Sequence, residues 1–170
     1  MKLFNIFNKK QSKTYFNYVG ELPHDLKTEI KQTISSTPKF FKIESNDEKN
    51  IVKEIYEIVE NILKTNSFPK EYSTIDNVAV ALGIYYGQVI CDYYNWSWKM
   101  LGPKSKHDAI VSIVSPNEKF SIQPMNYMLK ILTNNNIDLA KKNDNTVLLL
   151  FNMLKNIEQN PTENKYTPLS

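Results

Sequence analysis

The single cysteine and the two histidines of this 170-residue chain are the side chains best suited to catalysis. Cys91 and His107 would form a nucleophile–base pair if the thiol were exposed and the imidazole lay beside it. Cys91, however, falls on the back of a segment that is apolar on nearly all sides. A free cysteine in such a place usually acts as a small hydrophobic residue, so we expect Cys91 to be structural.

Each histidine is followed by an aspartate, in the pairs His24-Asp25 and His107-Asp108. Such pairs occur in metal-dependent phosphohydrolases, but a metal site needs further histidine or carboxylate ligands on neighbouring helices. Both histidines of the chain are already used in these two pairs, which are typical of a helix start and a loop. The sequence therefore predicts no metal, no cofactor and no enzyme. A small enzyme that uses Cys91 or a His-Asp pair is the alternative.

All 21 basic residues are lysine, which excludes arginine-based phosphate clamps. Residues 1–20 contain four lysines and no acid and carry +4, whereas residues 21–170 contain 17 lysines and 18 acids and carry −1. A nucleic-acid-binding domain normally has its basic surface on the folded part, so we expect no nucleic-acid partner. Weak binding of nucleic acid or of a membrane surface through the lysine-rich N-terminus is a further alternative.

The length of the chain fits one domain. Composition predicts a basic flexible head over residues 1–20, a single α+β domain over 21–157 and a disordered tail over 158–170. One cysteine excludes a disulfide scaffold. The chain lacks both the roughly 20 apolar residues of a membrane span and the apolar region of about 7–15 residues of a signal peptide. The expected location is the cytoplasm.

Helical periodicity predicts two amphipathic helices in the first half of the chain. The first covers about 24–36 and is expected to stop at Thr37-Pro38. The second has an apolar face over 51–63, with Ser45 and Glu48 as its expected capping box. The charged side chains of its opposite face, which we interpret as solvated, are Lys53, Glu54, Glu57, Glu60 and Lys64.

A third predicted helix, about 74–94, is apolar nearly all round and is expected to be buried at the centre of the molecule. Gly83 and Gly87 lie one turn apart in it, where each costs about 1 kcal/mol relative to alanine. We therefore expect another backbone to pass close to them. The aromatic residues of this region are expected to pack in the core, since the folded part lacks a basic groove for base stacking: Tyr85, Tyr86, Tyr93, Tyr94, Trp96 and Trp98.

After residue 94 the hydrophobic period becomes two, which is typical of strands. Strands are predicted at 96–100, 109–114 and 120–123, followed by helices at about 125–133 and 145–157. The predicted fold class is therefore α+β, with N-terminal helices, a buried central helix, a three-stranded antiparallel meander and two C-terminal helices.

Several short motifs between Ala81 and Leu132 follow the order found in a known family. They are Leu82-Gly83 and Tyr86-Gly87 in a helix, Trp96 to Trp98 at the start of a strand, Ala109-Ile110-Val111, and Ile122-Gln123-Pro124-Met125 at a strand-to-helix step. On these motifs the stretch resembles the DUF3806-like family of bacterial domains of unknown function. The resemblance implies a helix–meander–helix fold and assigns no activity or site residue. Family members often have a longer acidic loop where this chain has the lysine-bearing loop 102–107.

These observations favour a non-catalytic, bacterial protein-interaction domain whose partner is another protein, for example an immunity-type protein that neutralises a toxin. Ile110 and Val114 point away from Val111 on the same strand, so they form a second apolar face that terminal helices or a partner must cover. The neighbouring loop carries lysines and no acid, which would steer an acidic partner to it. The predicted partner-contact residues are Lys104, Lys106, Ile110 and Val114.

Overall fold

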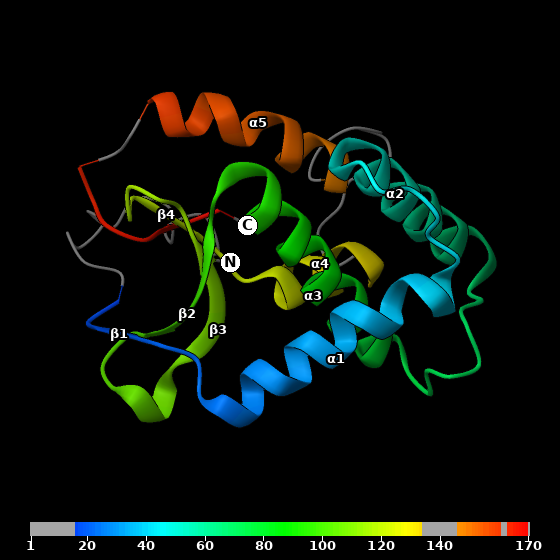
Figure 1. Ribbon diagram of the computed structural model, residues 1–170, viewed down its shortest axis with the longest axis horizontal. Helices are drawn as coiled ribbons and strands as arrows, with labels where there is room; N and C mark the ends of the chain where they lie inside the picture. The colour runs from blue at the N-terminus through cyan, green and yellow to red at the C-terminus, as the bar shows by residue number, and fades with distance from the viewer. Residues whose placement is uncertain (1–15, 134–145, 161–162, 170) are drawn as a thin grey trace, which may run out of the picture.

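The computed structural model describes residues 16–133, 146–160 and 163–169. A five-stranded sheet lies on one side of the molecule and the longer helices lie on the other, with α5 along the top of the view in Figure 1. The predicted α+β class is confirmed. In chain order the elements are β1 Tyr18–Gly20, α1 His24–Phe41, α2 Glu48–Thr65, α3 Ile75–Tyr94, β2 Ser97–Gly102, the 3-10 helix η1 Lys106–Asp108, β3 Ile110–Val114, β4 Phe120–Ile122, α4 Pro124–Leu132, α5 Val147–Gln159 and β5 Thr167–Pro168.

Helix α3 is the centre of the core, as its sequence predicts. It contacts α1, α2 and α4, and Leu82, Tyr86 and Ile90 are fully buried in it. Thr74 caps its first turn by accepting a hydrogen bond from the backbone N–H of Asn77, at 3.2 Å. A helix that is apolar on most sides is stable in water only when neighbours cover those sides, and here the other helices and the sheet cover most of it, while Val80 and Tyr93 stay exposed.

The close approach of another backbone, predicted at the two helical glycines, is confirmed at Gly83, whereas Gly87 meets side chains. A Cβ atom added to Gly83 would lie 2.6 Å from the Cα atom of Met125, at the start of α4. A Cβ atom added to Gly87 would lie 2.8 Å from side-chain atoms of Pro124 and Trp98. Both distances are shorter than van der Waals contact, so α4 can pack here only because the side chains are missing.

Helix α1 runs five residues beyond the predicted stop at position 36 and includes Pro38. Proline removes one backbone donor from a helix. The packing of the last turn outweighs that loss, because Phe41 is buried and stacks on Tyr72 at a centroid distance of 5.2 Å. The buried hydroxyl of Thr37 is also satisfied, since it donates to the carbonyl of Thr33 at 2.8 Å.

The expected capping box of α2 is wrong. Asp47 caps this helix by accepting a hydrogen bond from the backbone N–H of Asn50, at 3.1 Å. The hydroxyl of Ser45 instead donates to the carboxylate of Glu54, two turns further along the helix. Aspartate is an equally good N-cap, so the helix begins at Glu48, three residues before its apolar face, and Ser45 is free for a tertiary contact.

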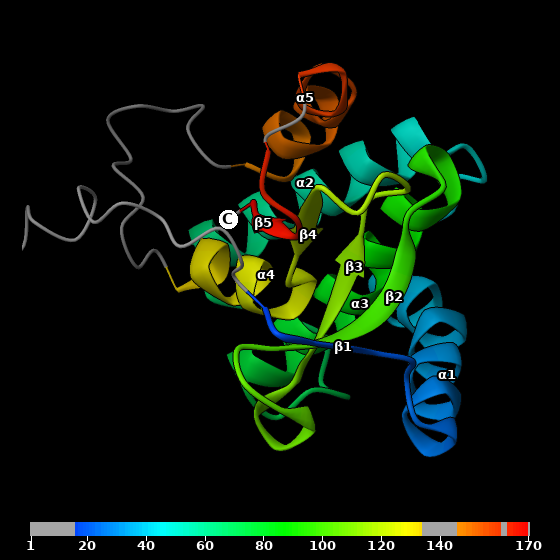
Figure 2. The same ribbon diagram turned by 90° about the vertical axis from the view of Figure 1, so that its left-hand side faces the viewer.

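The sheet is larger than the predicted three-stranded meander. Strands β2, β3 and β4 form that antiparallel meander, but β1 pairs with β2 in antiparallel fashion and β5 pairs with β4 in parallel fashion. Figure 2 shows β1 and β5 at the two edges of the sheet. These added strands are three and two residues long and lie far in sequence from the strands they join, so a local pattern could not predict them.

One face of the sheet packs on the helices and the other is covered by segments near the two ends of the chain. Trp98, Met100 and Val111 face α1 and α3. On the opposite face, Leu101 and Val114 are buried in a cluster that also contains Phe16 and Tyr166. The second apolar face predicted for strand 109–114 therefore exists, and residues of this chain cover much of it.

The predicted domain limits need correction. Residues 1–15 of the predicted flexible head lie outside the described residues, whereas the end of that head forms β1. The predicted disordered tail, 158–170, begins inside α5 and continues as residues 163–169, which we call the strap. The strap is ordered because β5 pairs with β4 and Tyr166 is buried, two interactions that its composition does not reveal.

Candidate binding site

The four predicted partner-contact residues do not form one accessible surface. Lys104 and Lys106 are exposed and Ile110 is 37% exposed, but Val114 is only 2% exposed and lies beneath the strap and Phe16 cluster. The prediction for Val114 is therefore wrong, because the chain itself covers this position.

The carboxylate of Asp108, the residue directly after the lysine loop, is hydrogen-bonded to the backbone of that loop. Asp108 accepts hydrogen bonds from the backbone N–H of Ser105, at 2.7 Å, and from that of Lys104, at 3.1 Å. The hydroxyl of Ser105 and these backbone donors hold the pKa of Asp108 below its ordinary value. An acid therefore adjoins the two lysines that we expect to attract an acidic partner.

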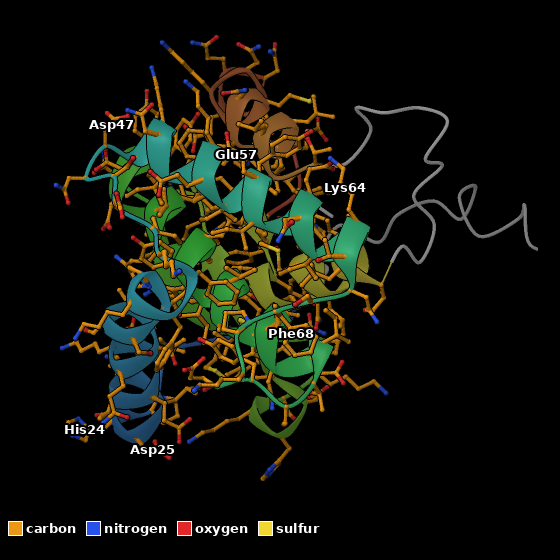
Figure 3. All side chains as sticks on the ribbon, turned by 90° about the vertical axis from the view of Figure 1, so that its right-hand side faces the viewer. His24, Asp25, Asp47, Glu57, Lys64 and Phe68 are labelled. Carbon is orange, nitrogen blue, oxygen red and sulfur yellow. The ribbon has the colours of Figure 1, made fainter. Side chains whose placement is uncertain are left out.

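The candidate catalytic groups lie in very different surroundings. Cys91 is buried in the main core, and burial raises the pKa of its thiol far above the ordinary value. His107 is exposed in η1, and His24 and Asp25 are exposed at the first turn of α1, as Figure 3 shows. Among the described residues, no three histidine, cysteine or carboxylate side chains gather where they could hold a metal ion.

The polar atoms of the central aromatic residues are used inside the protein. The Tyr86 hydroxyl donates to the carbonyl of Val147 at 2.9 Å, and the Tyr94 hydroxyl donates to the carbonyl of Phe151 at 2.7 Å. The Trp98 indole donates to the side chain of Gln88 at 3.0 Å. Core packing of these three residues is confirmed. Tyr93 differs, since it is 38% exposed.

A hollow on the surface lies between the end of α1, the second half of α2 and the segment after α2. It has a volume of about 500 Å³, and we call it the α1–α2 groove. In Figure 3, Glu57 of α2 and Phe68 of the following segment lie on this side of the molecule. The lining residues are Phe40, Phe41, Lys42, Glu44, Glu54, Glu57, Ile58, Asn61, Ile62, Ser67, Phe68 and Pro69.

Two left-handed residues shape this groove. Lys42 ends α1 with a φ of 57°, and Asn66 ends α2 with a φ of 50°. A left-handed residue after a helix turns the chain sharply back, so the segments that follow α1 and α2 both pass beside α2 instead of continuing along the helix axes. Phe68, which is half-buried, is thereby packed against the core at the edge of the groove.

Glu54 fastens one wall of the groove. Its carboxylate accepts hydrogen bonds from the backbone N–H of Glu44, at 2.9 Å, from the backbone N–H of Ser45, at 3.2 Å, and from the Ser45 hydroxyl. These bonds, led by that of the hydroxyl, hold the pKa of Glu54 below its ordinary value. The carboxylate thus fixes the loop after α1 against α2.

The groove combines an apolar floor with a negative rim. Phe41 and Ile62 are buried at its base, and Phe40 is 39% exposed beside them. Three carboxylates and one ammonium line it, which gives a net charge of −2. Glu57 is exposed and makes no ion pair with any of the described residues. The groove can therefore accept an apolar group that carries positive charge beside it.

Replacement of Glu54 by Gln is expected to weaken the fold in a pH-dependent way. Because its pKa is lower in the folded chain, the carboxylate stabilises the folded state above about pH 4.5, and this contribution is lost as the pH falls through the lowered pKa. Glu54→Gln should lower the melting temperature by about 2–4 °C at pH 7 and by much less at pH 3. Thermal unfolding followed by circular dichroism measures both values.

Glu57→Gln is the matched control, because it removes a carboxylate from the same helix without breaking a hydrogen bond that the structure contains. It should leave the melting temperature nearly unchanged at both pH values. An equal loss for Glu54→Gln at pH 7 and pH 3 would show that the carboxylate charge does not hold the loop.

The local sequence patterns did not indicate this groove. Its charged wall is the polar face of the second predicted helix, which the pattern of charges alone predicts to be solvated, and Phe40 and Phe68 lie outside the predicted helical faces. The available signal was an aromatic residue just beyond each predicted helix end, Phe40 after 36 and Phe68 after the apolar face. Aromatic residues just beyond a helix end, next to a carboxylate without an ion pair, indicate a binding surface more strongly than a charged helix face alone does.

No protein-family profile, curated protein or solved structure that was compared with the chain matches it. The resemblance of residues 81–132 to the DUF3806-like family accordingly stays a prediction. Within the described residues, no helix is both long and apolar enough to cross a bilayer.

Proposed function

We propose that this chain is a non-catalytic protein-interaction domain that binds, in the α1–α2 groove, a basic segment of another protein with an apolar side chain at its tip. The observation that carries the proposal is the groove itself, an apolar hollow of about 500 Å³ lined by Glu44 and Glu57, which make no ion pair with any of the described residues. The apolar tip would lie against Phe40, Ile58 and Phe68, and the ammonium or guanidinium groups would lie beside Glu44 and Glu57.

Within that class, we propose an immunity-type protein that acts in the cytoplasm and neutralises a toxin. A toxin that acts on nucleic acid must carry a basic surface, because phosphates dominate its substrate. A carboxylate-rimmed groove would bind such a surface and compete with the phosphates for it. The net charge of −2 at the groove supports this choice over an acidic partner.

Two peptides of identical length test the proposal. One contains lysine, leucine and phenylalanine, and the other has glutamate in place of each lysine. Binding of each peptide is measured by the shifts that it causes in the nuclear magnetic resonance spectrum of the protein. The lysine peptide is expected to shift the resonances of Glu57, Ile58 and Phe68. Glu57→Lys should weaken its binding about fivefold. Glu29→Lys, the same charge change on the exposed part of α1, is the matched control and should leave the binding nearly unchanged.

Equal binding of the two peptides would refute a groove that selects positive charge. So would an equal effect of Glu29→Lys and Glu57→Lys, since the attraction would then come from the overall charge of the chain. Shifts confined to residues outside the groove would refute the site.

A further inference from the structure

A second hollow adjoins the α1–α2 groove on the other side of Phe40. It has a volume of about 250 Å³ and lies between α1 and the first turns of α3, two helices that pack side by side in Figure 1. Because Phe40 lines both hollows, its side chain forms the ridge between them. We call the second one the α1–α3 hollow. The two helices line it with Thr33, Ser36, Phe40, Asn77, Val80 and Ala81.

The ridge between the hollows is apolar and held in place. The ring of Phe40 packs edge-on against that of Tyr72, at a centroid distance of 5.9 Å, and Tyr72 in turn stacks on the buried Phe41. Phe40 is 39% exposed, and Val80, on the α3 side of the second hollow, is 46% exposed. Large apolar side chains that stay exposed around adjoining hollows are typical of a binding surface.

The two hollows differ in charge. The groove has a net charge of −2, whereas no charged side chain is among the described residues that line the α1–α3 hollow. The hydroxyl of Thr33 donates to the carbonyl of Glu29 at 2.9 Å, and that of Ser36 to the carbonyl of Thr33 at 3.3 Å. The amide of Asn77 donates to the hydroxyl of Ser73 at 3.0 Å. With these donors already used, the hollow favours an apolar side chain without charge.

The spacing of the hollows along α1 fits an extended segment. Thr33 lines the α1–α3 hollow, and Phe41 lines the groove. The eight positions of α1 that separate these two residues correspond to a rise of about 12 Å. In an extended segment, side chains four residues apart point to the same side and lie about 13 Å from each other. Such a segment can therefore place one apolar side chain in each hollow.

We propose that the two hollows form one binding surface for an extended segment of a partner protein. The segment has apolar side chains at two positions four residues apart and positive charge beside the first of them. This inference rests on the proposed function, because the first apolar side chain and the positive charge occupy the α1–α2 groove. The continuity of the hollows across Phe40, and the change from a net charge of −2 to an uncharged lining, argue for this occupant.

Two peptides of equal length test the second position. Both contain two lysines followed by a phenylalanine. Four residues after the phenylalanine, the two-anchor peptide has leucine and the one-anchor peptide has serine. We expect the two-anchor peptide to bind the full chain about tenfold more tightly, because its leucine is buried in the α1–α3 hollow. Isothermal titration calorimetry measures both affinities. The two-anchor peptide alone should shift the methyl resonances of Val80 and Ala81.

A substitution in the α1–α3 hollow tests the same contact from the side of the protein. Val80→Ser removes an exposed apolar side chain of this hollow. It should weaken binding of the two-anchor peptide about threefold and leave that of the one-anchor peptide nearly unchanged. Met153→Ser, at a 45% exposed site of α5, is the matched control and should change neither affinity. Circular dichroism shows whether both variants keep the fold.

The outcomes separate this inference from the proposed function. Equal affinities of the two peptides, or equal losses for both with Val80→Ser, would overturn the inference. If the one-anchor peptide still shifts the resonances of Ile58 and Phe68 in that case, the groove binds its basic segment and the proposed function stands. If neither peptide shifts Ile58 or Phe68, the proposed function and this inference are both wrong.

Discussion

Gly83→Leu is expected to lower the free energy of unfolding by about 3 kcal/mol or more. Even the Cβ atom of the new side chain would lie 2.6 Å from the Cα atom of Met125 and 2.8 Å from the carbonyl oxygen of Pro124. Both are backbone atoms of α4, so relief requires the whole helix to move, whereas overpacking against side chains typically costs about 1–3 kcal/mol. Urea unfolding followed by circular dichroism gives the value.

The smaller substitution Gly83→Ala separates packing from helix propensity. Alanine should stabilise a helix by about 1 kcal/mol relative to glycine, yet here it should destabilise the protein because its Cβ meets the same backbone. Gly87→Leu should cost less than Gly83→Leu, since it meets the side chains of Pro124 and Trp98. Val80→Leu, at a 46% exposed site of the same helix, is the control. A stabilised Gly83→Ala would contradict the close approach.

Tyr86→Ala is the second change with a large expected effect, a loss of about 3–5 kcal/mol in the free energy of unfolding. Tyr86 is fully buried, stacks on Tyr127 at a centroid distance of 6.3 Å and is among the largest side chains of the core. Removing its ring leaves a cavity in the main core, where Tyr86 is covered completely. Urea unfolding of the purified variant measures the loss.

Tyr86→Phe divides that loss between the ring and the hydroxyl. The hydroxyl donates to the carbonyl of Val147, which begins α5, so its removal should cost only about 1 kcal/mol. Burial also raises the pKa of Tyr86 well above its ordinary value, so this hydroxyl stays protonated and able to donate. A loss for Tyr86→Phe equal to that for Tyr86→Ala would place the stabilisation in the hydrogen bond.

The elements with strong internal periodicity could be predicted from the sequence alone. Helix α3 was expected at about 74–94 and runs from Ile75 to Tyr94, because an apolar pattern of this length has no other stable solution in water. The meander β2–β4 followed from alternation. Even the close packing at Gly83 could be inferred, because a glycine inside a helix lowers the stability of that helix and is expected mainly where a side chain would not fit.

The remaining elements depend on interactions between distant residues. The extension of α1 past Pro38 requires Tyr72, and the order of the strap requires the edge of β4. The α1–α2 groove has the same origin, since Phe40, Glu57 and Phe68 come from three separate segments. Local propensity cannot show which distant segments meet, and here they decide both the candidate site and the covered face of the sheet.

The pairing of β5 with β4 also has a consequence during translation. Thr167 pairs with Phe120, so 47 residues separate the two strands in the chain. At a synthesis rate of about 5–20 residues per second, the edge of β4 stays unpaired, and Leu101 and Val114 lack the cover of Tyr166, for roughly 2–9 s after they leave the ribosome. For that interval the nascent chain presents an unpaired strand next to an apolar strip, the kind of surface that chaperones bind and that neighbouring nascent chains on one messenger can join.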